Sequence, residues 1–133
     1  MSKNLIPPSN DILFYSSPGG DIRVEVFFQE ETFWLSQKKM AELFSVVSNT
    51  ITYHLKEIYQ SGELQQISTT RKIRVVQKEG NRNVSRDVDF YNLDAIIAVG
   101  YRVNSYQATQ FRIRTTQTLK EFIIKGKNKS LYY

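Results

Sequence analysis

The stretch 35–59 constrains the fold of this chain more than any other. Its apolar residues recur at helical spacing in two short runs, which predicts one helix over Ser36–Leu43 and a second from about Ser48 to Tyr59. A serine stands at the start of each run and is expected to be its N-cap. The four residues between the runs leave room only for a sharp turn. Two helices joined in this way are typical of the helix-turn-helix motif.

The spacing meets three further requirements of that motif and departs from two. Ala41 supplies the small residue where the helices cross, Val46 the apolar residue after the turn, and Ile51 the inner anchor of the second helix. The turn position that favours a positive φ, often a glycine, is Ser45. An inner position that is usually apolar is His54. The pattern still favours a helix-turn-helix over an ordinary helical hairpin packed in a core.

The outer face of the second helix carries the functional prediction. It is polar, as base edges and phosphates require, whereas a buried face would not need such groups. We expect contacts with base edges from Asn49, Thr52 and Tyr53. We expect phosphate contacts from Lys38, Lys39, Ser48, Lys56, Arg74, Lys78 and Arg82. The predicted function is sequence-specific binding of double-stranded DNA by a transcriptional or phage-type regulator.

Composition and charge agree with that function. The chain has 133 residues, 41% of them hydrophobic, which suits one compact domain with a core. It has no cysteine and no apolar run long enough to span a membrane, so we expect a cytoplasmic protein without disulfides, signal peptide or membrane contact. The first 35 residues hold two basic and five acidic residues, and the last 34 hold seven basic and one acidic. This asymmetry predicts one face suited to an anion.

Strand patterns lie before the two helices. Ile12–Tyr15 and the alternating run Ile22–Phe28 flank the turn residues 16–20, which predicts a β-hairpin. Thr32–Leu35 predicts a third short strand that leads into the first helix. Residues 1–10 are expected to form a disordered leader.

A second hairpin and two further helices are predicted after the helix pair. Residues 65–70 are expected to be a loop, and Lys72–Gln77 and Val84–Tyr91 to be strands joined by a turn at Glu79-Gly80-Asn81. A hairpin in this place is the wing of a winged helix. Asn92 should cap a helix over Leu93–Val103, and Asn104 or Ser105 a helix over about Tyr106–Lys125.

These elements predict an α+β fold: a winged helix-turn-helix with an N-terminal β-hairpin and two C-terminal helices. Residues 11–126 would form a single winged-helix-like domain, and residues 127–133 a basic tail.

Four stretches of this sequence resemble the RhuM family of bacterial virulence-associated proteins: TFWLSQKKMAELFSV, HLKEIYQSGEL, YNLDAIIAVGYRVNS and QFRIRTTQTLKEFIIKG. The resemblance implies a DNA-binding protein, similar in style to phage antirepressor and regulator modules. It also implies that family members continue beyond the C-terminal end of this chain. The chain departs from the family at Arg114, where the family tends to have an aromatic residue.

An enzymatic function is not expected. Asp87 and Asp89 share a strand face near Asp94, as in the beginning of a nuclease metal site, but they are better explained as balancing Arg86 on an exposed strand. His54 is the only histidine and has no second ligand at metal-binding spacing, so it should pack at a helix crossing and bond a carbonyl. We expect no catalytic residue, metal, cofactor or small-molecule substrate.

The alternative function is a protein-interaction module of the antirepressor or adaptor kind. In it, the helix over 106–125 would bind a partner or a second copy through Phe111, Leu119, Phe122 and Ile123. The competing interpretation is that this stripe closes the domain's own core. A homodimer would reconcile the two functions, because paired recognition helices contact two half-sites.

The segment between the last two helices has two interpretations. Arg102 and Arg112 could bind phosphate or a partner carboxylate. We favour a structural role, in which Arg102 bonds helix C-terminal carbonyls and Asn104 and Ser105 are caps.

Overall fold

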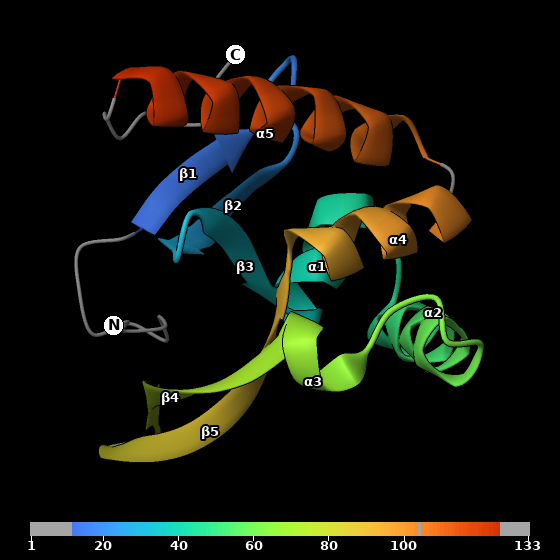
Figure 1. The fold of residues 1–133 in the computed structure, drawn as a ribbon. Coiled ribbons are helices and arrows are strands. Elements are labelled where there is room, and N and C mark those ends of the chain that lie inside the picture. Colours follow the sequence, from blue (N-terminus) through green and yellow to red (C-terminus); the bar gives the residue numbers. More distant parts are fainter. Residues whose placement is uncertain (1–11, 104, 126–133) are drawn as a thin grey trace.

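The computed structural model describes residues 12–103 and 105–125, with residues 119–125 described by their backbone alone. Within these ranges the chain forms five strands and five helices, an α+β fold (Figure 1). The expected leader at 1–10 and basic tail at 127–133 lie outside the described residues.

The elements follow one another in the order strands, helices, strands, helices. They are β1 (Ile12–Ser16), β2 (Arg23–Gln29), β3 (Thr32–Ser36), α1 (Gln37–Phe44), α2 (Ser48–Gln60), α3 (Gln66–Thr69), β4 (Thr70–Glu79), β5 (Arg82–Asn92), α4 (Leu93–Val103) and α5 (Tyr106–Lys125).

The strands form one antiparallel sheet with the order β1-β2-β3-β5-β4. Both predicted hairpins and the third strand are confirmed, and the second hairpin is longer than predicted because Glu79 pairs with Arg82 across a two-residue turn. Strand β3 pairs with β2 on one side and with β5 on the other, where Leu35 lies opposite Tyr91. It therefore joins the two hairpins into a single sheet.

Helices α1 and α4 pack on one face of this sheet, and α5 meets the same face through the contact of Phe111 with Tyr15 (Figure 1). Helix α2 packs on α1 and α4. Successive strand residues point to opposite faces, so Phe33 and Leu35 enter the main core while Trp34 joins a smaller cluster with Phe27 and Phe90. In that second cluster, Trp34 Nε1 donates a hydrogen bond of 3.1 Å to a backbone carbonyl. The sheet thus has an apolar cluster on each face.

Three of the predicted helix caps are confirmed and one is wrong. The side chains of Ser36, Asn92 and Ser105 accept amide hydrogen bonds of 3.2, 3.2 and 3.1 Å at the starts of α1, α4 and α5. Ser48 is not the cap of α2, because the helix begins at Ser48 itself and the preceding Val47 occupies the N-cap position. Its hydroxyl is engaged elsewhere, in a bond from the first helix.

The segment 65–70 was expected to be a loop, and this expectation is wrong. A one-turn helix, α3, forms there, and β4 begins directly after it. Thr69 is buried, donates a 2.8 Å hydrogen bond to the Gln65 carbonyl, and lies 2.9 Å from the Tyr59 hydroxyl. These tertiary contacts stabilise a turn that has no helical pattern of its own.

The turn between α1 and α2 has the conformation that the motif requires, although it contains no glycine. Ser45 is left-handed, with φ 58° and ψ 45°. Its amide donates to the Glu42 carbonyl at 3.3 Å, and the Val46 amide donates to the Ala41 carbonyl at 3.0 Å. These two bonds satisfy carbonyls that the helix end would otherwise leave unpaired.

Replacement of Ser45 by glycine should therefore raise the free energy of unfolding, by about 0.5–1 kcal/mol, because glycine adopts the left-handed conformation without strain. Urea denaturation would measure the change. The control is Ser61→Gly at the end of α2, where φ is −77° and glycine should lower stability. A loss of stability in Ser45→Gly would contradict this account of the turn.

Candidate nucleic-acid interface

Helices α1 and α2 pack through the residues predicted from the spacing. Ala41 and Ile51 are buried, and Val46 is half-buried against the same core. Leu55 and Ile58 continue the inner stripe of α2. This packing leaves the opposite side of α2 in solvent.

Gln37, the first residue of α1, holds the N-terminal turn of α2. Its Nε2 lies 3.1 Å from the Ser48 carbonyl oxygen, 2.9 Å from Ser48 Oγ and 2.5 Å from Thr52 Oγ1. Thr52 Oγ1 in turn donates to the Ser48 carbonyl at 3.3 Å. The hydroxyls of Ser48 and Thr52, predicted to contact phosphate and a base, are thus engaged within the chain. Gln37 was not among the predicted site residues, and a glutamine at the first position of a short helix is the only signal of this role in the sequence.

The outward face of α2 carries Asn49, Tyr53 and Lys56, all exposed as predicted. Tyr53 is 59% exposed, and a hydrogen bond to Glu57, followed by the charge of that carboxylate, raises the pKa of its phenol above the ordinary value. The side chains of Asn49 and Lys56 make no hydrogen bond or ion pair with any other residue in the described part of the chain.

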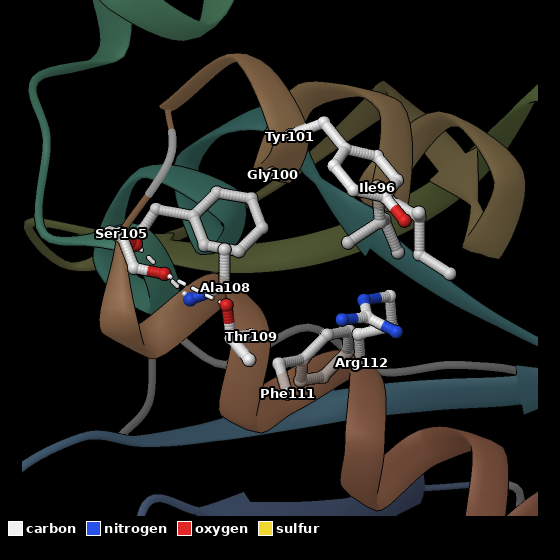
Figure 2. A pocket seen from close by; sticks show the side chains of 10 residues that line it. Ile96, Gly100, Tyr101, Ser105, Ala108, Thr109, Phe111 and Arg112 are labelled. Carbon is white, nitrogen blue, oxygen red and sulfur yellow. Dashed lines mark hydrogen bonds between the residues drawn. The ribbon is translucent and has the colours of Figure 1, made fainter.

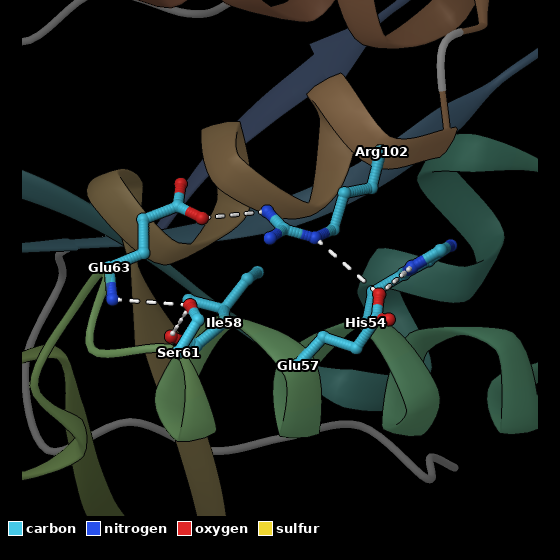
Figure 3. Close-up of polar contacts among 6 residues, drawn as sticks. All are labelled: His54, Glu57, Ile58, Ser61, Glu63 and Arg102. Carbon is cyan, nitrogen blue, oxygen red and sulfur yellow. Dashed lines mark hydrogen bonds and ion pairs between the residues drawn. The ribbon is translucent and has the colours of Figure 1, made fainter.

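Arg102 of α4 pairs with one carboxylate of α2 and with another just after the end of that helix (Figure 3). Its Nη1 lies 2.9 Å from Glu63 Oε1, and its Nε lies 3.7 Å from Glu57 Oε1. Arg102 therefore pairs with carboxylates of its own chain rather than with helix carbonyls, which corrects the details of the expected structural role. Its side chain is 28% exposed, and its two ion pairs connect α4 to the C-terminal half of α2 and to the turn that follows.

His54 lies beside this group, and its predicted carbonyl bond is not found. Its Nδ1 is buried, has no hydrogen-bond partner among the described residues, and lies 3.8 Å from Glu57 Oε1 (Figure 3). The C-terminal end of α2 lies nearby. There Gly62 is left-handed, and the Glu63 amide donates a hydrogen bond of 3.2 Å to the Ile58 carbonyl.

Most cations of hairpin β4–β5 are paired with carboxylates. Arg74 Nε lies 3.2 Å from Asp87 Oδ1, and Lys72 Nζ lies 2.8 Å from Asp89 Oδ1. The expectation that these aspartates balance Arg86 is wrong, because strand register places Asp87 opposite Arg74 and Asp89 opposite Lys72. The Arg86 side chain instead reaches along the hairpin to Glu79, with Nη2 2.6 Å from Oε2. Arg71 of β4 has its partner outside the hairpin: it lies 3.1 Å from Glu30 in the turn between β2 and β3, and its guanidinium lies over the Trp34 ring.

The predicted phosphate contacts thus differ in how much of their charge is compensated. Arg74 is paired, and Lys39 lies 3.5 Å from Glu42 in the same helix. Four exposed cations form no ion pair with other residues in the described ranges: Lys38, Lys56, Lys78 and Arg82. The last two flank the turn of hairpin β4–β5, which projects away from the helices (Figure 1).

Helices α4 and α5 line a partly open pocket of about 100 Å³ (Figure 2). A Cβ added to Gly100 would lie 3.1 Å from Ala108 Cβ, so the helices approach closely here. The guanidinium of Arg112 lies over the Tyr101 ring, at 5.8 Å from its centre. Phe111 is buried in the main core, as the competing interpretation of the α5 stripe predicted, and the remaining stripe side chains lie outside the described ones.

Among the described residues, no group of three or more histidine, aspartate or glutamate side chains is placed to hold a metal ion. None of the described helices combines the length and the apolar character needed to cross a membrane.

Comparison with known proteins places one segment in a family. Residues 68–128 match the model of the Virulence protein RhuM family. The match covers hairpin β4–β5 and helices α4 and α5, whereas α1 and α2 lie before it. Comparisons with curated proteins and with solved structures gave no match.

Proposed function

We propose that this chain, a member of the RhuM family through residues 68–128, binds double-stranded DNA sequence-specifically through a winged helix-turn-helix. Helix α2 would lie in the major groove, and hairpin β4–β5 would contact the flanking backbone as the wing. The protein would act as a transcriptional or phage-type regulator. The proposal involves no catalytic step, cofactor or small-molecule substrate.

The order of elements supports the winged form of the motif. Strand β3 leads into α1 and α2, and hairpin β4–β5 follows them. β3 then pairs with β5, so the hairpin is held beside the helix pair by three residue pairs between Trp34 and Ser36 on one side and Phe90 and Asn92 on the other. This arrangement gives a wing a fixed base and a projecting tip.

The polar outward face of α2 is the observation that carries the proposal. Asn49 stands in the first turn of the helix, which is the part that contacts base edges in helix-turn-helix proteins. The carboxamide of asparagine can donate to and accept from adenine in the major groove. Tyr53 follows one turn later, and Thr52 would contribute through its methyl group, because its hydroxyl is engaged by Gln37.

The cations that would contact phosphate are those whose charge is not compensated by a carboxylate of the chain. Lys38 and Lys56 lie on the helix pair, and Lys78 and Arg82 lie at the hairpin tip. Exposed ion pairs such as Arg74–Asp87 are weak in water, but their net charge is zero, so they add little long-range attraction to DNA.

The test is binding of the protein to a pool of random duplexes at two salt concentrations, followed by sequencing of the bound fraction. An enriched motif that persists at the higher salt concentration is the expected result, and its symmetry would report whether a homodimer binds. Binding without a motif that collapses with salt would leave only a basic surface. Absence of binding would reject the proposal.

Lys56→Ala should weaken binding to selected and random duplexes alike and reduce the slope of log K against log salt concentration by about 0.9, the value for one lost phosphate contact. Fluorescence anisotropy across a salt series would measure the slope. Lys72→Ala is the matched control, because that lysine is paired with Asp89 and should leave the slope unchanged. Equal changes in both variants would contradict the assignment of Lys56.

A second candidate is protein interaction through α4 and α5, in the manner of an antirepressor or adaptor. Three exposed apolar side chains favour it: Tyr101, Tyr106 and Ile113. A second copy of the chain seated there would give the homodimer expected for paired half-sites. Sedimentation velocity over a range of concentrations would detect it.

A further inference from the structure

Val47 is an exposed apolar residue at the start of the proposed recognition helix. It is the N-cap of α2, with φ −78° and ψ 156°, and 69% of its surface is exposed. Its neighbour Val46 is half-buried against the core, so the two valines of the turn have different environments. The core does not explain the choice of an apolar side chain at Val47.

The N-cap position also makes valine an unfavourable choice for stability. Serine, threonine, aspartate and asparagine are preferred there because their oxygens accept an amide hydrogen bond, and valine cannot. Of the four helices with eight or more residues in the described part of the chain, α1, α4 and α5 have such a side-chain cap, and α2 has none. Val47 therefore places an exposed isopropyl group at a position where a polar side chain would stabilise the helix.

The place of Val47 suggests what the isopropyl group contacts. It precedes Asn49 by two residues, at the end of α2 that enters the major groove in the proposed complex. Gln37 holds the adjoining turn through Ser48 and Thr52, so the position of this end is fixed before DNA binds. In the major groove the C5-methyl group of thymine is the one apolar feature that distinguishes the bases.

We infer that Val47 is a specificity-determining residue that packs against the C5-methyl group of a thymine in the target site. The inference rests on the proposed function, since it requires that α2 lie in the major groove. Burial of one methyl group contributes about 0.8 kcal/mol, so loss of the methyl from that thymine should weaken binding about fourfold. No other thymine in the site should respond through Val47.

The test replaces each thymine of the selected duplex in turn with deoxyuridine, which lacks only the methyl group, and measures affinity for the wild-type protein. We expect one position, or one per half-site, at which binding weakens about fourfold. In Val47→Ser the difference between thymine and deoxyuridine at that position should disappear, while the thermal midpoint should not fall, because serine supplies the missing cap. Ile67→Ser is the control: Ile67 is 90% exposed on α3, and its loss should leave the difference intact.

The outcomes separate this inference from the proposed function. Wild-type binding that is insensitive to every deoxyuridine replacement would overturn the role of Val47 and leave DNA binding in place. A thymine preference that persists in Val47→Ser would do the same. A chain that selects no duplex at all would overturn both.

Discussion

Replacing Phe111 with alanine should lower the free energy of unfolding by about 3–5 kcal/mol, the range for loss of a buried phenyl ring. Phe111 is 1% exposed, and its ring meets that of Tyr15 edge-on, with centres 5.0 Å apart. Truncation would leave a cavity where α5 packs on the sheet, and the close approach of α4 and α5 at Gly100 and Ala108 limits how far the helices can relax into it. Urea denaturation followed by circular dichroism would measure the loss.

The control for this change is Ile113→Ala on the same helix. Ile113 is 40% exposed, so its truncation should cost less than about 1 kcal/mol. A loss for Phe111→Ala as small as that for Ile113→Ala would mean that α5 does not bury the Phe111 side against the sheet. That result would also favour the alternative in which the apolar stripe of α5 binds a partner.

The largest effect on function is expected for Asn49→Ala. It should cost about 1–3 kcal/mol on the selected duplex, or about 5- to 150-fold in affinity, with little change on random DNA. Asn49 is exposed in the first turn of α2, so the protein should stay folded and the loss should come from contacts with the bases. Titration of both duplexes at one salt concentration would measure the ratio.

Gln60→Ala, at the other end of α2, provides the matched control and should change neither affinity. Equal losses on selected and random DNA for Asn49→Ala would show that this residue contributes to general affinity and not to base recognition. The recognition surface would then have to be sought elsewhere on the chain.

Much of the fold followed from local patterns in the sequence. Helical and strand periodicity located the helix pair, both hairpins and the two C-terminal helices, and Ser36 and Asn92 could be recognised as caps from their places alone. Elements held by distant contacts could not be found in this way. Helix α3, which depends on Thr69 meeting Tyr59, was expected to be a loop.

The partners of charged and polar side chains were harder to predict. The turn was placed at Glu79-Gly80-Asn81, but it consists of Gly80 and Asn81 alone, with Glu79 opposite Arg82. That register sets which cation faces which aspartate, so the shorter turn would have indicated the pairing of Lys72 with Asp89. The bond from Gln37 to α2 required the packing of two helices, which local spacing does not specify.

The position of β3 in the sheet determines how much of the chain must fold as a unit. The family segment 68–128 contains β5 but not β3, the strand that covers one edge of β5. It also contains Arg102, whose partners Glu57 and Glu63 both lie outside it. Expressed alone, the segment would have an unpaired strand edge prone to self-association and a cation without either of its two carboxylates. We therefore expect the unit that folds autonomously to extend beyond the segment of sequence similarity and to include β3.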